Sequence, residues 1–209
     1  MRLLVFGASG RTGQEVVRQA ATRGFQVTAF VRQPEKMRDA ADSVSIVTGS
    51  VVDANAVSTA VNGHDAVVSA LGVGTPLKHD ADVVAGVEHI VRAMEAHGVR
   101  RLIYVSFIGV RESRNAVGFI LRYVAPIPLR HEISDHEIKE RLVRKSELDW
   151  TVVRPPKLTT GPHTGRYRTG EHIRTMSPVP LLSRADLADF IVGELEQPRF
   201  IRGVPRVLS

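Results

Sequence analysis

Short apolar runs alternate with segments of helical spacing through the first half of the chain. Runs rich in Val, Ile, Leu and Phe, typical of strands that are buried on both faces, occur at Leu3–Phe6, Gln26–Val31, Val44–Val47, Ala66–Ser69 and Arg101–Val105. The intervening segments predict helices over Thr12–Arg23, Glu35–Ala40, Asn55–Val61 and Asp80–His97. This alternation predicts β-α-β units that build a parallel sheet with right-handed crossovers.

The second half of the chain is less regular. The segment of about 106–135 mixes Gly and Pro with large apolar residues, and the segment of about 157–182 is rich in Gly, Pro and Thr. We expect both to lie over a substrate pocket. Regular elements are predicted around them: a helix over Glu132–Ser146 with an apolar stripe that includes Ile138, a strand over Trp150–Val153, a helix from Ser183 to about Glu196, and a strand over Val204–Leu208. Asp53 and Ser183 are predicted N-caps. Since no linker interrupts the pattern, we predict one domain over residues 1–209.

Three glycines follow the first apolar run with the spacing G-x-x-G-x-x-G. Gly7 lets the chain turn sharply, Gly10 lets the backbone approach a pyrophosphate, and Gly13 lets the next helix pack closely on the sheet. The amino terminus of that helix attracts phosphate. Glycine-rich turns also occur in proteins that bind no nucleotide, so the prediction depends on the strand before and the helix after. Together these features predict a Rossmann-type, doubly wound parallel sheet in an α/β domain with substrate-side loop and helix insertions.

The end of the second predicted strand indicates which dinucleotide binds. Sites for NAD place an acidic residue there, whereas sites for NADP place a cation near the 2′-phosphate. Here Arg32 occupies that position and Lys36 follows it, although Glu35 lies between them. A guanidinium can bind the 2′-phosphate through two hydrogen bonds. We therefore predict NADP (NADPH), with a solvated surface arginine as the alternative interpretation of Arg32.

The composition excludes several classes of site. The 209 residues contain no cysteine, and the eight histidines and the acids form no metal-ligand pattern, so we predict no metal. The net charge of +6 is spread over many segments with few aromatic residues, which favours phosphate-bearing small molecules over nucleic acid. No apolar run is long enough to span a bilayer and no signal peptide is recognisable, so we expect a cytoplasmic protein without membrane contact. The oligomeric state stays open.

Several motifs resemble those of the NmrA-like, atypical branch of the short-chain dehydrogenase superfamily. They are Gly7–Gly13, the strand end at Val31-Arg32, Asp65–Gly72 and Leu148–Pro155. A closer resemblance to the biliverdin-IXβ reductase/flavin reductase type lies in Ser134–His136, Arg144–Leu148, Pro155-Pro156 and Thr164–Tyr167. The resemblance covers nearly the whole chain and implies a bound dinucleotide.

The resemblance also implies which residues contact the cofactor. The pyrophosphate would be held by Gly7, Ser9, Gly10, Arg11 and Thr12. The 2′-phosphate would be held by Arg32 and Lys36, the adenine flanked by Ser50 and Val51, and the nicotinamide ribose lined by Leu71 and Gly72. The last two residues end the fourth strand, where ligands gather in open α/β sheets.

The usual proton-donor pair of short-chain dehydrogenases is missing. These enzymes use a tyrosine and a lysine four residues apart, and none of the three tyrosines has a lysine at that spacing. The candidate catalytic residues are Ser106, at the end of the fifth strand, and His136 on the next helix, with His131 as an alternative. Ser106 could hydrogen-bond the substrate, or only complete the strand end. His136 could donate a proton or bind an anionic substrate, or be an exposed helical residue without a role.

Such a site suits hydride transfer to a conjugated ring system, which relies on stacking and alignment more than on a dedicated acid. Phe107, Phe119 and Tyr123 are predicted to supply the stacking surface. We therefore predict an NADPH-dependent reductase of flavins, quinones or linear tetrapyrroles. The alternative is an NADP-binding redox sensor of the NmrA type, which would bind the cofactor without turnover and signal to a protein partner.

Overall fold

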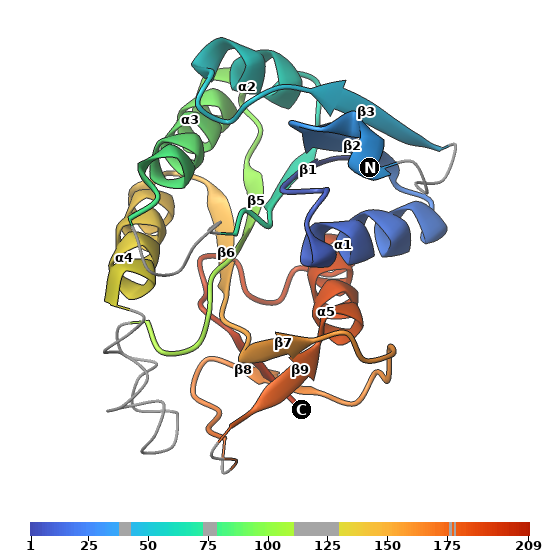
Figure 1. The fold of residues 1–209 in the computed structure, drawn as a ribbon, viewed down its shortest axis with the longest axis vertical. Coiled ribbons are helices and arrows are strands. Elements are labelled where there is room, and N and C mark those ends of the chain that lie inside the picture. Colours follow the sequence, from blue (N-terminus) through green and yellow to red (C-terminus); the bar gives the residue numbers. More distant parts are fainter. Residues whose placement is uncertain (38–42, 73–78, 111–129, 176, 178) are drawn as a thin grey trace.

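Six parallel strands form the central sheet of the computed structural model, in the order β3-β2-β1-β4-β5-β6 (Figure 1). Their bounds are β1 Arg2–Phe6, β2 Gln26–Val31, β3 Val44–Thr48, β4 Ala66–Ser69, β5 Arg101–Val105 and β6 Asp149–Val153. The structure describes residues 1–37, 43–72, 79–110, 130–175, 177 and 179–209. This strand order is that of a Rossmann-type, doubly wound α/β domain, which confirms the predicted fold class.

The order in which the chain adds strands reverses beside β1. This strand pairs with β2 on one side, where Leu4 lies opposite Thr28, and with β4 on the other, where Leu4 lies opposite Val67. Strand β3 extends the sheet beyond β2, and β5 and β6 extend it beyond β4. In open parallel sheets, ligands bind outside the carboxyl ends of the strands at such a reversal. The ends of β1, β2 and β4 therefore mark the expected position of a dinucleotide.

Helices cover both faces of the sheet (Figure 1). Helices α1 (Arg11–Thr22) and α5 (Arg184–Glu196) pack over the face that carries Leu3 and Val5. Helices α2 (Ala54–Val61), α3 (Ala81–His97) and α4 (Arg130–Lys145) pack over the face that carries Leu4 and Phe6. Successive residues of a strand point to opposite faces of the sheet. A strand that is covered by helices on both faces must therefore be apolar at consecutive positions, so that it fills the hydrophobic core on each side. Within the described ranges, no helix has both the length and the hydropathy that crossing a bilayer requires.

The predicted caps are present at the helix ends. The carboxylate of Asp53 accepts hydrogen bonds from the backbone N–H of Asn55 at 2.9 Å and of Ala56 at 3.1 Å, just before α2. The hydroxyl of Ser183 accepts from the backbone N–H of Asp186 at 2.9 Å, just before α5. Both N-cap predictions are therefore confirmed.

Very short strands complete the carboxyl-terminal part of the fold. Strand β7 (Lys157–Thr159) pairs in parallel with β9 (Leu181–Ser183), and β8 (Arg168–Gly170) pairs antiparallel with β10 (Arg206–Leu208). The sequence predicted the last of these, as Val204–Leu208, but not the other three. Three residues are too few to display a hydrophobic period, so these strands are defined by their partners.

Two helical segments differ from their predictions. Within Glu35–Ala40 the described residues form a single 3-10 turn, η1 (Pro34–Met37), and residues 38–40 lie outside the described part. In α4, Ile138 is 40% exposed, so its place in the apolar stripe was wrong. Among the residues of α4 whose burial is described, the buried ones are Ile133, Asp135, His136, Lys139, Glu140 and Val143. Helix α4 therefore presents polar side chains to the core.

Candidate functional site

At the glycines of the turn between β1 and α1, an added Cβ would crowd backbone atoms. Gly7 has a φ of +75°, and a Cβ there would lie 2.5 Å from the carbonyl oxygen of Ala70, just beyond β4. A Cβ on Gly13 would lie 2.2 Å from the carbonyl oxygen of Gly7, and one on Gly10 would lie 3.2 Å from the same atom. The turn is thus a bare backbone cradle at the start of a helix, which fits a pyrophosphate.

The predicted 2′-phosphate residues follow β2, the strand that pairs with β1 next to this turn. Arg32 directly follows β2 and Lys36 belongs to η1, and both are exposed. The side-chain amide of Gln14 donates to the carbonyl of Ser9 at 3.4 Å and to that of Lys36 at 3.2 Å, so η1 is tied to the glycine turn. Among the residues that the structure describes, neither Arg32 nor Lys36 forms an ion pair. Both cations are therefore available to a phosphate at the end of β2.

A second positive region lies where α1 and α5 begin. Burial lowers the pKa of Arg184, the first residue of α5, and the neighbouring charge of Arg11, the first residue of α1, lowers that pKa further. The two helices are joined by Gln19, whose side-chain amide donates to the Ala185 carbonyl at 2.8 Å. Two guanidinium groups close together favour an anionic ligand between them.

The other predicted cofactor residues also lie at the carboxyl edge of the sheet. Ser50 and Val51 follow β3 and are partly exposed, and the Val51 carbonyl accepts from Nδ1 of His89 on α3 at 2.9 Å. Leu71 and Gly72 follow β4. The contacts of these four residues with a cofactor stay predictions.

The two candidate catalytic residues meet at the carboxyl end of β5. The Ser106 hydroxyl oxygen lies 3.4 Å from Nδ1 of His136, and the two residues are 5% and 6% exposed. The interpretation of His136 as an exposed helical residue is therefore wrong. Ser106 donates its single proton to Oε1 of Glu140 at 2.6 Å, so its oxygen can only accept further hydrogen bonds. Since Glu140 is itself engaged in an ion pair, Ser106 is not arranged as an activated nucleophile.

Sequence reasoning missed three members of this buried cluster: Tyr104, Glu140 and Arg154. The Tyr104 hydroxyl lies 3.1 Å from Nδ1 of His136. The Arg154 guanidinium donates to both carboxylate oxygens of Glu140, from Nε at 3.0 Å and from Nη2 at 2.6 Å. All three residues are at most 1% exposed.

Two signals in the sequence could have found the cluster. The spacing of Ile133, His136, Glu140 and Val143 puts all four on one side of a helix, so polar residues share the apolar face. Arg154 directly follows a buried strand and precedes two prolines. A long side chain at such a position does not reach solvent easily, so it indicates a buried partner for the guanidinium.

Burial sets the protonation of the cluster. Burial raises the pKa of Tyr104 well above its ordinary value of 10, and the charges of Glu140 and Asp135 act in the same direction. Burial lowers the pKa of His136 well below its ordinary value of 6.5, and the charge of Lys139 acts in the same direction. Both side chains are therefore neutral near pH 7. His136 is a neutral hydrogen-bonding group in this site rather than a charged proton donor.

Of the predicted stacking surface, Phe107 belongs to the described residues. Its ring centroid lies 5.0 Å from that of His136, with an angle of 74° between the rings. Phe119 and Tyr123 lie in the range 111–129, outside the described residues. The alternative histidine, His131, packs edge-on against His79 at 4.4 Å.

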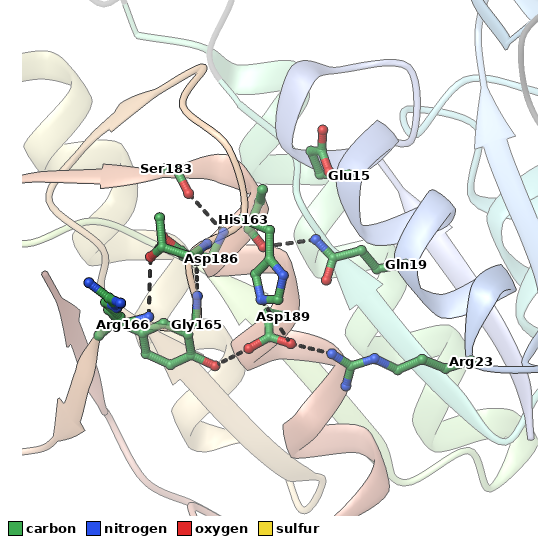
Figure 2. Close-up of polar contacts among 12 residues, drawn as sticks. Glu15, Gln19, Arg23, His163, Gly165, Arg166, Ser183, Asp186 and Asp189 are labelled. Carbon is green, nitrogen blue, oxygen red and sulfur yellow. Dashed lines mark hydrogen bonds and ion pairs between the residues drawn. The ribbon is translucent and has the colours of Figure 1, made fainter.

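The segment after β7, which was predicted to lie on the substrate side, is fastened to α5 (Figure 2). Asp186 accepts from the backbone N–H groups of Thr164 at 2.7 Å and Gly165 at 2.9 Å, and from the Thr164 hydroxyl at 2.9 Å. One turn later, Asp189 accepts from the Tyr167 hydroxyl at 2.5 Å. These contacts hold the chain near residues 164–167 beside the start of α5.

Comparison with known proteins agrees with this geometry. Residues 7–198 match the model of a family described as NAD(P)H-binding. The matched range contains the glycine turn, the whole of the buried cluster and α5.

This chain is similar to individual relatives and to solved structures, and the share of each protein that the similarity covers differs. A (4-alkanoyl-5-oxo-2,5-dihydrofuran-3-yl)methyl phosphate reductase of Streptomyces griseus is 33% identical over 153 residues, which cover 73% of this chain and 46% of that protein. The structure of a short-chain dehydrogenase/reductase of Veillonella parvula in complex with NADP has a TM-score of 0.81 at 20% identity, covering 100% of this chain and 94% of the other. ChuY, an anaerobilin reductase of Escherichia coli O157:H7, has a TM-score of 0.81 at 21% identity, covering 99% and 96%. At these identities the two solved structures establish the fold that they share with this chain.

Proposed function

Because the chain belongs to the NAD(P)H-binding family of atypical short-chain dehydrogenases, we propose that it is an NADPH-dependent reductase of a conjugated acceptor. The acceptor would be a flavin, a quinone or a linear tetrapyrrole, as for the biliverdin-IXβ reductase/flavin reductase type. The observation that carries the proposal is that one edge of the sheet holds both the bare glycine cradle with Arg32 beside it and the buried pair Ser106–His136.

The chain's own residues would choose and hold the cofactor. The amides at the start of α1 and the side chain of Arg11 would bind the pyrophosphate. Arg32 and Lys36 would bind the 2′-phosphate, which an acidic residue at the end of β2 would repel. When bound, the dihydronicotinamide would supply the hydride that reduces the acceptor.

The buried cluster favours a conjugated acceptor over a simple ketone. Reduction of a ketone to an alcohol needs a proton delivered to oxygen as the hydride arrives, and the usual tyrosine–lysine pair is missing. In a conjugated acceptor the added charge spreads over several atoms, so a hydrogen bond from a neutral group suffices. The S. griseus relative is named for a substrate with oxo and alkanoyl groups on a dihydrofuran, and ChuY is named for reduction of anaerobilin.

A spectrophotometric assay tests the proposal. NADPH and NADH are each incubated with the purified protein and FMN, a quinone or biliverdin, and the absorbance at about 340 nm is followed. We expect oxidation of NADPH with at least one acceptor and a lower kcat/KM for NADH. Arg32→Glu serves as the control, since it should remove the preference for NADPH while leaving the buried cluster intact.

A different outcome would favour the sensor alternative. Tight binding of NADP, measured by calorimetry, together with no oxidation of NADPH by any acceptor would exclude the reductase.

A further inference from the structure

Tyr104 is fully buried beneath α4, and its hydroxyl contacts His136. It lies two residues after Leu102 on β5, so both side chains point to the face of the sheet that α3 and α4 cover. Its exposed fraction is 0%, and its hydroxyl lies 3.1 Å from Nδ1 of His136. A phenol in the core without a hydrogen bond costs free energy, so this contact accounts for its presence there.

The direction of this hydrogen bond follows from the neighbouring groups. Tyr104 and His136 are both neutral near pH 7, and the phenol must donate its proton to an acceptor. Among the described residues, Nδ1 of His136 is the acceptor that the Tyr104 hydroxyl contacts. The Ser106 hydroxyl does not compete for Nδ1, because its proton goes to Glu140 at 2.6 Å while its distance to Nδ1 is 3.4 Å. A neutral imidazole that accepts at Nδ1 carries its own hydrogen on Nε2.

We propose that Tyr104 is a positioning residue that holds His136 in the tautomer with hydrogen on Nε2, so that His136 donates a neutral hydrogen bond to an oxygen of the acceptor. This inference rests on the proposed reductase function and assigns the residue that binds the acceptor's oxygen. Among the residues that the structure describes, no hydrogen-bond acceptor engages Nε2 of His136. The Phe107 ring, edge-on to the imidazole at 5.0 Å, restricts rotation of the ring.

The substrate class that fits this donor is a conjugated carbonyl compound. When a hydride from NADPH adds to the far end of such a system, a C–H bond of the dihydronicotinamide would break to leave NADP⁺. The new bond to hydrogen would be C–H where the hydride adds to carbon and N–H where it adds to N5 of a flavin, and the π electron pair would move to the carbonyl oxygen. That oxygen accepts the hydrogen bond from Nε2 and later takes a proton from water. A neutral imidazole can stabilise such an oxygen without itself becoming ionised. Quinones, the carbonyl groups of flavins and the terminal lactams of linear tetrapyrroles all contain this unit.

Nitrogen-15 NMR of the folded protein tests the tautomer directly. The protein is labelled at its histidine nitrogens, and the signals of His136 are assigned by their loss in His136→Gln. We expect the Nε2–H tautomer in the unmodified protein and a mixture of tautomers in Tyr104→Phe. Tyr167→Phe, which removes a hydroxyl bound to Asp189 instead, is the matched control and should leave the His136 signals unchanged. An Nδ1–H tautomer in the unmodified protein, or no change in Tyr104→Phe, would overturn the proposal.

Kinetics test the consequence of the tautomer. In Tyr104→Phe we expect kcat to fall about tenfold, which is the loss of about 1.4 kcal/mol of transition-state stabilisation, with an unchanged Kd for NADPH. An unchanged kcat alongside an altered tautomer would also overturn the proposal. Failure of the proposed function is distinguishable: no NADPH oxidation by the unmodified protein with any acceptor rejects the reductase and the donor role of His136, whatever the NMR signals show.

Discussion

Arg154 and Glu140 form a bidentate ion pair inside the core, and their side chains are 1% and 0% exposed. The pair joins the residue after β6 to the middle of α4. Oε1 of Glu140 also accepts the Ser106 hydroxyl, so one carboxylate connects β5, β6 and α4. Since His136 lies one helical turn before Glu140, this ion pair also fixes the imidazole relative to the sheet.

Breaking this ion pair should be strongly destabilising. Glu140→Gln or Arg154→Met each leaves a buried charge without its counter-ion, so we expect each to lower the free energy of unfolding by about 3–5 kcal/mol. The double variant should lose clearly less than the sum, because it leaves no lone charge. Urea denaturation measures all three. Glu88→Gln, which removes the exposed pair with Arg92, is the control and should change stability by less than about 1 kcal/mol. Additive losses in the double variant would contradict the coupling.

Arg32 should select the phosphorylated cofactor. Arg32→Glu removes a charge-assisted hydrogen bond and adds repulsion, so the Kd for NADPH should rise by about 30-fold, or about 2 kcal/mol, with little change for NADH. Calorimetry with both cofactors measures this. Arg92→Glu makes the same change of charge on the exposed face of α3 and should leave both affinities unchanged. Equal losses of affinity in the two variants would point to net charge rather than to a contact.

The glycine turn should not tolerate a methyl group. In Gly13→Ala the new Cβ would lie 2.2 Å from the Gly7 carbonyl oxygen, which is backbone and cannot move aside cheaply, so we expect loss of dinucleotide binding and lower stability. Gly193→Ala is the matched control, because in α5 nothing lies within 4 Å of the added Cβ. That substitution should stabilise the protein by about 0.5–1 kcal/mol. Retained NADPH binding in a folded Gly13→Ala variant would contradict the cradle.

His136 should make stability fall in mild acid. Its pKa in the folded protein lies well below 6.5, so as the pH drops below about 6.5 the unfolded chain gains a proton that the native state does not. The free energy of unfolding should therefore decrease by about 1.4 kcal/mol per pH unit from this group, until the folded pKa is reached. Urea titrations at several pH values measure the slope. His136→Gln should flatten it, whereas His172→Gln, at an exposed histidine, should not. A slope unchanged by His136→Gln would show that the imidazole is not neutral in the native state.

Local features of the sequence were sufficient to predict the strands of the sheet, two helix caps and the glycine turn. The bounds of β2, β4 and β5 agree with the predicted runs, since strands buried on both faces must be apolar throughout. Asp53 and Ser183 were recognisable as caps because each acts on N–H groups only two or three residues away. The glycine spacing likewise describes a turn within seven residues.

The buried cluster could not be predicted in the same way. Glu140 and His136 belong to a helix with many charged residues, and their burial depends on β5 and β6 lying directly beneath it. Tyr104 and His136 are 32 residues apart along the chain, so no local pattern links them.

By itself, the sequence determined the strand–helix alternation, the bare glycine turn and the cation at the end of β2, because each follows from residues that are neighbours along the chain. Only the tertiary structure decided that Tyr104 and Ser106 contact His136, that Glu140 pairs with Arg154 beside Ser106, and that burial, together with the charge of Lys139, keeps His136 neutral. Protonation in a protein core depends on which groups are brought together and on how much water is excluded, and packing of distant segments sets both.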